Sequence, residues 1–433
     1  MIKRFPVKIM FYLTKILNVI LQWQHFPEIW KTAKITPILK AKKPASSPDS
    51  YRPISLLSSL SKILEAVLLR RINDYLEHNG IIIPYQFGFR RHHSTVNQLY
   101  RVVEFITEGA QQKKVTGGLF LDIAKAFDRV WLEALIYKLH NLGFPGYIIN
   151  TVNSYLTGRH FVVQLANTLS TRRKILAGVP QGSLLGPTLF NIYVNDIPVT
   201  DNTTLAMYAD DTAILTQSAF PSLAIQRLQA YINILETWLV KWKIRVNVDK
   251  TQAILFTRRK KINGKLSLYE QEIPWAKQVL YLGVILCNTL TWTPHITSII
   301  QKFRVAKITL HPLIARNSVL SIDNKLLIYK TVLRPILCYA CPVWAYSCKS
   351  SRKRLQRVQN LILRQITNAP WYIRNSKIHE ELKVEEICKF YGRLARKFYA
   401  NLPNIENPDL FSGSSAAFPD CIVYVTCLNL HTP

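Results

Sequence analysis

The chain has 433 residues, of which 48% are hydrophobic and 19% are charged. This composition supports a sizeable buried core and excludes a disordered or collagen-like protein. The 56 Lys and Arg outnumber the 26 Asp and Glu, which gives a formal net charge of +30. Such an excess indicates a polyanionic partner, either nucleic acid or an anionic membrane surface. At roughly 100–200 residues per domain, the length predicts about two to four domains.

The N-terminal segment 1–23 places basic residues before an apolar stretch, but Lys8 and Lys15 interrupt it and no small-residue cleavage site follows. We therefore predict no signal peptide. No window reaches about 18 uninterrupted apolar residues, so we predict no transmembrane span and an intracellular protein. The seven cysteines argue against a disulfide framework, because their number is odd and their spacing shows no tight repeat. In the tightest group, 338–348, we expect buried free thiols rather than zinc ligands.

Several segments carry clear patterns of regular structure. Residues 40–53 are rich in Pro, Ser and Lys and predict a mobile basic loop. Apolar residues at helical spacing predict helices over 56–76, from Ser94 as a cap, over 184–196 and over 221–242. An apolar run over 118–123 predicts a short strand. Short strands mixed with longer helices predict an α+β fold.

The positive charge is concentrated in two flanks. Residues 1–60 carry ten Lys and Arg against two acids, and residues 273–379 carry sixteen against Asp323 alone. The aspartates described next lie between them. This layout is expected if the flanks hold phosphates while the centre holds cations. Solvated basic faces explain short charge runs well, but they explain a hundred-residue stretch nearly empty of acids less well.

The segment AMYADDTAIL, residues 206–215, predicts a tight β-hairpin with Asp210 and Asp211 at its turn. Adjacent carboxylates raise each other's pKa unless a cation neutralises them. For this segment alone, an ordinary solvated turn is the simpler explanation. The strand at 118–123 weakens that explanation, because it ends in a third acid, Asp122. If the two elements are neighbours in one sheet, their carboxylates can hold two divalent ions roughly 3.5–4 Å apart, which suits phosphoryl or nucleotidyl transfer.

A third feature is the glycine-rich turn GVPQGS, residues 178–183, which precedes the helical pattern at 184–196. Glycines at a helix start permit close backbone approach to a ligand, and a helix N-terminus favours phosphate. Alone this turn is a weak signal. For Asp128, which follows the strand acid, a place at a helix N-terminus is the better explanation.

Taken in order, the strand acid, the glycine-rich turn and the double-acid hairpin resemble the reverse transcriptases of non-LTR retrotransposons of the jockey-like group. The resemblance covers roughly residues 20–400. The matching stretches are FLDIAKAFDRVW, GVPQGSLLGPTLFNIYVNDI, YADD, WKTAKITPILK, YRPISLLSSLSKILE, QFGFRRHHST, VNVDKT and YLGV. The resemblance implies a right-hand polymerase with fingers, palm and helical thumb. It also implies an RNA-directed DNA polymerase that extends a DNA primer with dNTPs on an RNA template.

The resemblance assigns the metal site and the nucleotide pocket. Asp122, Asp210 and Asp211 are expected to be the catalytic triad holding two Mg²⁺ ions, for which Mn²⁺ could substitute. Phe127 resembles the aromatic steric gate that selects deoxynucleotides, although a core position is the alternative. The residues that resemble the lining of the nucleotide pocket are Gln181 and Gly182.

Further roles concern phosphates and the primer. Lys40 and Arg52 match fingers positions expected on the incoming triphosphate, and for Lys40 a loose phosphate patch is about equally well supported. Lys250 matches the lysine that assists pyrophosphate departure, with an ordinary surface lysine as the alternative. The YLG stretch at 281–283 resembles the primer-grip turn.

The expected domains are fingers with N-terminal helices over 1–118, palm over 119–285, thumb over 286–375 and a C-terminal extension over 376–433. The tail 412–433 does not resemble the family. We expect no membrane partner, and endonuclease activity would come from another chain or a missing upstream domain. The expected place of action is the nucleus, with the cytoplasm as the alternative.

Two other functions remain open from the sequence. One is a truncated, catalytically silent nucleic-acid-binding remnant. The other is a maturase-like protein that mainly binds RNA, which the spelling of WKTAKITPILK and CYACPVW disfavours.

Overall fold

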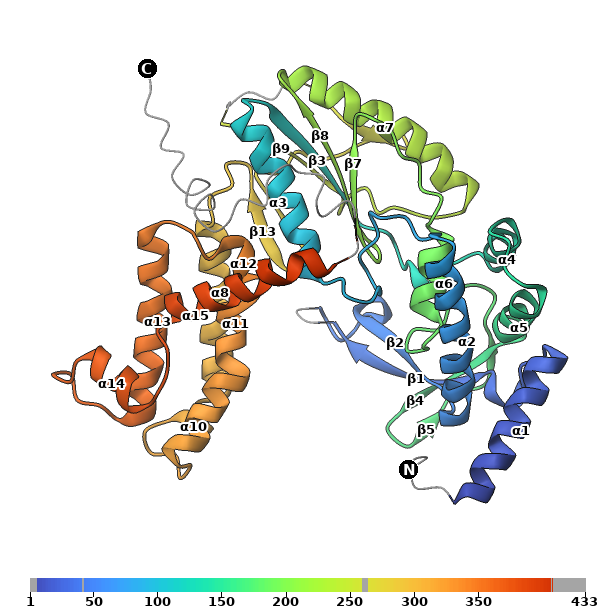
Figure 1. Ribbon diagram of the computed structural model, residues 1–433, viewed down its shortest axis with the longest axis horizontal. Helices are drawn as coiled ribbons and strands as arrows, with labels where there is room; N and C mark the ends of the chain where they lie inside the picture. Colours follow the sequence, from blue (N-terminus) through green and yellow to red (C-terminus); the bar gives the residue numbers. More distant parts are fainter. Residues whose placement is uncertain (1–5, 41–42, 259–263, 406, 408–433) are drawn as a thin grey trace. The chain divides into compact units, whose positions relative to one another are not determined.

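The computed structural model describes residues 6–40, 43–258, 264–405 and 407 (Figure 1). The chain divides into two compact units, each made of discontinuous segments. The first unit comprises Met1–Phe89, Asp122–Val199 and Tyr231–Asn247, and the second comprises Arg90–Leu121, Thr200–Ala230 and Val248–Pro433. None of the described helices is both long and apolar enough to cross a membrane.

The first unit is built on a mixed sheet whose strand order is β2-β1-β4-β5, with β6 paired to β4. β1 is antiparallel to β2 and parallel to β4. Helix α1 packs beside α5, and α4 packs against α5 and α6 (Figure 1). The elements are α1 Val7–Trp23, η2 Glu28–Trp30, β1 Thr32–Leu39, η3 Pro48–Ser50, β2 Tyr51–Leu56, α2 Ser59–His78, η4 Phe127–Arg129, α4 Leu132–Asn141, α5 Gly146–Leu156, β4 His160–Leu165, β5 Thr168–Leu169, β6 Arg173–Lys174 and α6 Gly186–Tyr193.

Helix α2 supplies much of this unit's core because its apolar side chains recur every three or four residues. Leu64, Leu68 and Ile72 are completely buried. The predicted helix 56–76 is therefore confirmed, with boundaries shifted by two or three residues. Helix α6 covers only the middle of the predicted 184–196 stretch.

The second unit contains an antiparallel sheet of order β7-β8-β3-β9. All seven residues of β3 are buried, because it is a central strand. Helix α3 packs along β3 and β7, while Leu228 of α7 lies against Gly117 of β3 (Figure 1). The elements are α3 Thr95–Gln111, β3 Val115–Leu121, β7 Thr204–Tyr208, β8 Asp211–Ser218, β9 Gln252–Phe256, β10 Ser267–Leu268, β11 Gln271–Glu272, β12 Gln278–Tyr281 and β13 Val284–Cys287. Helix α7, Pro221–Lys241, begins in this unit and ends in the first.

The rest of the second unit is helical, and one hydrophobic core runs from α3 and the sheet into these helices. In α13, Leu355, Ile362 and Ile366 are buried, whereas Arg354 and Arg357 lie outside this apolar face. The elements are α8 Thr293–Thr309, α9 His311–Ile314, α10 Ile322–Ile328, η5 Tyr329–Leu333, α11 Arg334–Cys338, α12 Cys341–Trp344, α13 Lys349–Thr367, α14 Asn375–Glu381, α15 Ile387–Asn401 and η6 Leu402–Asn404.

Local sequence signals located several boundaries well. The Ser94 hydroxyl accepts a hydrogen bond from the Asn97 amide at 3.2 Å, so the predicted helix cap is confirmed. The predicted helix 221–242 is α7, and the predicted strand 118–123 is β3, which ends at Leu121.

Two predictions were wrong in part. The segment 40–53 is not one loop, because Tyr51–Leu56 form β2 paired with β1, so Arg52 lies in a strand. Residues 41–42 of that segment lie outside the described residues. Among the grouped thiols Cys341 is buried and Cys338 is half-buried, but Cys348 is exposed because it precedes the first turn of α13. The tail 412–433 also lies outside the described residues, and the predicted domain boundaries stay predictions.

Candidate active site

Two of the predicted acids lie at the hairpin between β7 and β8. Tyr208 pairs with Asp211, so Ala209 and Asp210 form a two-residue turn. Ala209 has φ 58°, a left-handed conformation that costs an L-residue about 1–2 kcal/mol. The predicted tight hairpin is confirmed. Asp210 is half-buried, and Asp211 is exposed at the first position of β8.

The third predicted acid follows the neighbouring strand of the same sheet. Leu121, the last residue of β3, pairs with Thr212, the second residue of β8. Asp122 comes directly after Leu121 in the chain, as Asp211 comes directly before Thr212. The half-buried Asp122 belongs to the first unit, where its carbonyl accepts a hydrogen bond from the Asn247 amide at 2.8 Å. The expected neighbourhood of the two strands is thus confirmed.

The donor set is all carboxylate. In the part of the chain that the structure describes, no group of three or more His, Cys, Asp or Glu side chains is gathered closely enough to hold a metal ion. Carboxylate oxygens are nevertheless the ligands that Mg²⁺ and other hard divalent cations prefer. The chemistry of Asp122, Asp210 and Asp211 therefore fits such cations.

The glycine-rich turn lies in the first unit as a loop in direct backbone contact with η4, and we call residues 178–186 the pocket loop. Gly178 donates to the Val130 carbonyl, and Val179 donates to the Phe127 carbonyl, both at 2.8 Å. Gly178 has φ 92°, and a Cβ there would lie 2.7 Å from the carbonyl carbon and oxygen of Asp128. Only glycine fits this approach.

The same loop is also attached to β2. The Ser55 amide donates to the Gln181 carbonyl at 2.9 Å. Gly182 has φ 102°, and a Cβ there would lie 2.9 Å from the backbone carbonyl oxygen of Ser55. The two predicted pocket residues are therefore held against the strand that carries Arg52, whose side chain is exposed.

Phe127 lies in η4 and packs with two other rings of the same unit. Its ring stacks on Phe190 of α6 with a centroid separation of 4.9 Å, and it meets Phe89 edge-on at 6.1 Å. Phe127 is only half-buried, whereas Phe190 is buried. One face of the Phe127 ring thus packs on Phe190 while part of the ring stays accessible. This arrangement suits either a steric gate or a residue at the edge of the core.

Asp128 has a role that its sequence position did not indicate. Its carboxylate accepts a hydrogen bond at 2.8 Å from the Gln181 side-chain amide, so it orients a predicted pocket residue. Burial raises the pKa of Asp128, and this effect is opposed by the Gln181 hydrogen bond and by the charges of Lys125 and Lys40. The expected helix N-terminus is only a three-residue 3-10 helix, so the macrodipole explanation is replaced by this contact.

The remaining predicted phosphate contacts differ in their surroundings. Lys40 follows β1, and its ammonium donates to the Asp49 carbonyl at 2.9 Å. The Asp49 carboxylate pairs with Lys125 at 3.0 Å, and this hydrogen bond lowers the pKa of Asp49. Lys40 and Arg52 thus lie in the first unit with the pocket loop. Lys250 is exposed in the second unit, two residues before β9.

The predicted primer-grip turn joins β12 to β13. Leu282 and Gly283 have φ 44° and 79°, as a two-residue hairpin turn requires. The Tyr281 hydroxyl donates to the Ala206 carbonyl of β7 at 3.0 Å, and its pKa is raised by burial and then by the charge of Asp211. Tyr339 donates to the Leu282 carbonyl at 2.8 Å. These contacts connect the turn to the hairpin that carries the acids.

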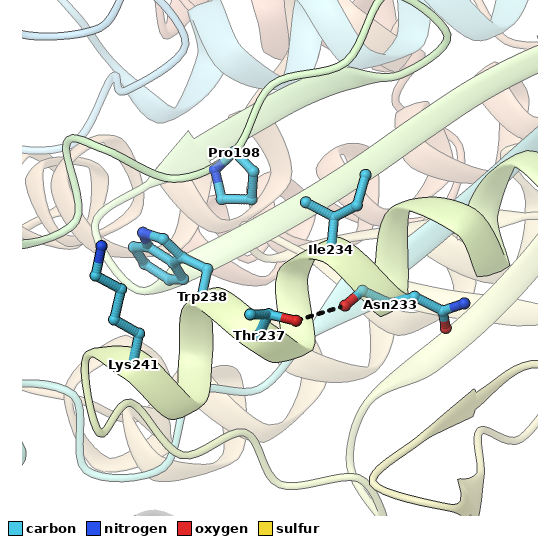
Figure 2. Close-up of a pocket in the computed structure, with 6 residues that line it drawn as sticks. All are labelled: Pro198, Asn233, Ile234, Thr237, Trp238 and Lys241. Carbon is cyan, nitrogen blue, oxygen red and sulfur yellow. Dashed lines mark hydrogen bonds between the residues drawn. The ribbon is translucent and has the colours of Figure 1, made fainter.

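A groove on α7 is separate from the predicted site residues. The groove has a volume of about 470 Å³, and none of the predicted site residues is among those that line it (Figure 2). Beside it, the buried Lys138 pairs with Asp196, and the Trp238 indole donates to the same carboxylate. Burial lowers the pKa of Lys138 to about 8, but its contacts are those of a packed ion pair. The groove is lined by Pro198, Asn233, Ile234, Thr237, Trp238 and Lys241.

Comparisons with known proteins show which family the chain belongs to. The sequence model of the family "Reverse transcriptase (RNA-dependent DNA polymerase)" matches residues 39–286. The chain is 37% identical over 412 residues to the "Probable RNA-directed DNA polymerase from transposon X-element" of Drosophila melanogaster, covering 94% of this chain and 45% of that protein. It is 38% identical over 409 residues to the "RNA-directed DNA polymerase from mobile element jockey" of the same organism, covering 93% and 44%.

The chain thus spans under half the length of these relatives. Among solved structures, the telomerase of Candida tropicalis with a fragment of telomeric RNA is 12% identical and has a TM-score of 0.42, covering 82% of this chain and 64% of that one. The predicted resemblance to jockey-like elements is confirmed by the two fly proteins. Because the family match covers more than half of the chain, the chain belongs to the reverse transcriptase family, and the predicted α+β, right-hand polymerase fold class is confirmed.

Proposed function

We propose that the chain is the RNA-directed DNA polymerase of a non-LTR retrotransposon and extends a DNA primer with dNTPs on an RNA template. The observation that carries the proposal is the register of the second unit's sheet, in which the end of β3 lies opposite the start of β8. This register supports a shared role for the acid that follows β3 and the two acids of the β7–β8 turn. Family membership supports the same reaction.

Asp122, Asp210 and Asp211 would hold two divalent cations, Mg²⁺ in this proposal, with Mn²⁺ as a substitute. When bound, such ions lower the pKa of the attacking hydroxyl and neutralise the leaving pyrophosphate. The primer 3′-hydroxyl would lose its proton to solvent, and its oxygen would form a bond to the α-phosphorus of the dNTP while the bond to pyrophosphate breaks.

The nucleotide would be bound mainly by the first unit. Lys40 and Arg52 contact the triphosphate in this proposal, and the accessible part of Phe127 blocks a ribose 2′-hydroxyl. Gln181, oriented by Asp128, faces the templating pair together with Gly182. Lys250 would donate a proton to the departing pyrophosphate.

The template and primer would be bound through their phosphates. Residues 273–379 carry sixteen Lys and Arg and a single acid, and this excess supports sequence-independent, salt-sensitive binding. The proposed place of action is chromosomal DNA in the nucleus, at a nick made by an endonuclease of another chain or of an upstream domain.

The test is incorporation of dTTP on poly(rA)/oligo(dT) with Mg²⁺ by the purified chain and its Asp210→Asn variant. The variant removes a metal ligand without removing a basic contact, so incorporation should fall to background while template–primer affinity stays within about twofold, an energy change below about 0.4 kcal/mol. Asp201→Asn is the matched control, since Asp201 is an exposed aspartate in the loop before β7. A folded wild-type chain that binds the duplex without incorporating dTTP contradicts the proposal and favours a silent binder.

A further inference from the structure

A buried carboxylate of α2 contacts the pocket loop. Glu65 is completely buried, and its Oε2 accepts a hydrogen bond from the Leu184 amide at 2.8 Å. Its Oε1 accepts a hydrogen bond from the Ser61 hydroxyl at 2.8 Å. Both carboxylate oxygens are thus used, one inside the helix and the other on the loop.

The charge of Glu65 lies in a buried polar cluster rather than at the surface. Arg159 is only 1% exposed, and two of its guanidinium nitrogens, Nε and Nη2, have no hydrogen-bond partner among the residues that the structure describes. Tyr155, also buried, lies within electrostatic reach of both groups: its pKa is raised by burial and by the charge of Glu65, and lowered by Arg159. Ionised side chains are almost never fully buried unless opposite charges compensate them.

The contact with Leu184 is transmitted along a short, internally bonded loop. The Ser183 amide and hydroxyl both donate to the Pro180 carbonyl, at 3.2 and 2.9 Å, and the Ser183 hydroxyl accepts from the Gly186 amide at 2.9 Å. Pro180 to Ser183 is therefore a closed turn that contains Gln181 and Gly182. Leu184 directly follows this turn, so the hydrogen bond from its amide to Glu65 restrains the C-terminal end of the turn.

We propose that Glu65 is a positioning residue for the nucleotide pocket, which holds Gln181 and Gly182 in place through the Leu184 amide. The inference rests on the proposed function, because it assigns the pocket loop to nucleotide binding. Besides the backbone hydrogen bonds that Gly178 and Val179 make at the start of the loop, two contacts hold Gln181 itself. The Ser55 amide donates to its carbonyl, and the Asp128 carboxylate accepts from its side-chain amide. Glu65 supplies a further attachment at Leu184, directly after the turn.

The test compares two substitutions of Glu65 in the full chain. Glu65→Leu removes both acceptors at similar volume and leaves the Leu184 amide without its partner. Glu65→Gln keeps one oxygen that can accept from Leu184. Glu77→Leu and Glu77→Gln are matched controls, because Glu77 is exposed near the end of the same helix.

In steady-state incorporation, Glu65→Leu should raise the KM for dTTP at least roughly tenfold, equivalent to about 1.4 kcal/mol. The KM of Glu65→Gln for dTTP should stay within about threefold of the wild-type value. Neither variant should change template–primer affinity. A purely structural role would lower the folded fraction, and hence the apparent kcat, without changing KM. An unchanged KM for a folded Glu65→Leu variant would overturn the inference.

A second measurement needs neither activity nor a folded Glu65→Leu variant. Hydrogen exchange of the Leu184 amide should be several-fold faster in Glu65→Gln than in Glu77→Gln, because a charge-assisted hydrogen bond becomes a neutral one. Equal exchange in these two variants would overturn the inference. An inactive wild type whose Leu184 amide responds in this way would instead place the failure in the proposed function.

Discussion

Gly178→Ala should destabilise the protein much more than Gly80→Ala, although both glycines have positive φ. Gly80 has φ 57° and open space around it. Its substitution costs about 1–2 kcal/mol in backbone strain, offset by roughly 0.5–1 kcal/mol because alanine loses less backbone entropy on folding. A net loss of about 1 kcal/mol follows for this control.

At Gly178 a steric cost is added to the strain. The new Cβ would lie 2.7 Å from backbone atoms of Asp128, which cannot rotate away as a side chain can. Overpacking of this kind costs about 1–3 kcal/mol, so the total loss should be about 3 kcal/mol. The shift would also lengthen the Gly178–Val130 hydrogen bond, and the KM for dTTP should rise.

Urea unfolding followed by tryptophan fluorescence measures the stability of both variants, and incorporation kinetics measure the pocket. The free energies of unfolding of the two variants should differ by about 2 kcal/mol, which is a factor of roughly 30 in the unfolding equilibrium constant. Equal losses for the two variants would refute the steric argument and the tight approach of the pocket loop to η4.

Three other predictions concern the second unit. Burial raises the pKa of Glu104 to about 7, so its ionisation opposes folding as the pH rises above the unfolded value near 4.5. Glu104→Gln should therefore add about 2 kcal/mol to the free energy of unfolding at pH 8 and under about 1 kcal/mol at pH 5, and an equal gain at both pH values would contradict this. Hydrogen bonds from neighbouring serines lower the pKa of Cys348 to about 7, whereas burial raises the pKa of Cys338. At pH 7, iodoacetamide should therefore label Cys348 more than about tenfold faster than Cys338, as mass mapping would show. Tyr339→Phe removes the hydrogen bond to the Leu282 carbonyl and should cost about 1 kcal/mol in thermal unfolding; no change in Tm would mean that this turn does not depend on it.

Local patterns predicted those parts of the fold whose causes are local. Apolar spacing located α2 and α7, and Ser94 located the start of α3. The hairpin turn followed from two acids between apolar runs. Each signal lies within one element, so it needs no knowledge of what packs against that element.

Contacts between distant segments could not be predicted in this way. Arg52 lies in a strand because β1 pairs with β2, whereas its own Pro- and Ser-rich surroundings indicate a loop. Glu65 resembles any polar residue of an amphipathic helix, and Asp128 resembles a helix cap. Their partners lie 119 and 53 residues further along the chain.

The attachments of the pocket loop also set an order for folding during synthesis. The ribosome releases Ser55, Glu65 and Asp128 well before the loop, whose Leu184 amide is 119 residues beyond Glu65. Until then the Glu65 carboxylate has no loop amide from which it can accept a hydrogen bond. Burying the carboxylate without such a partner is costly. The first unit therefore reaches its final packing only after residue 184 has left the exit tunnel. We expect nascent chains that end before this point to expose α2 to proteases and chaperones.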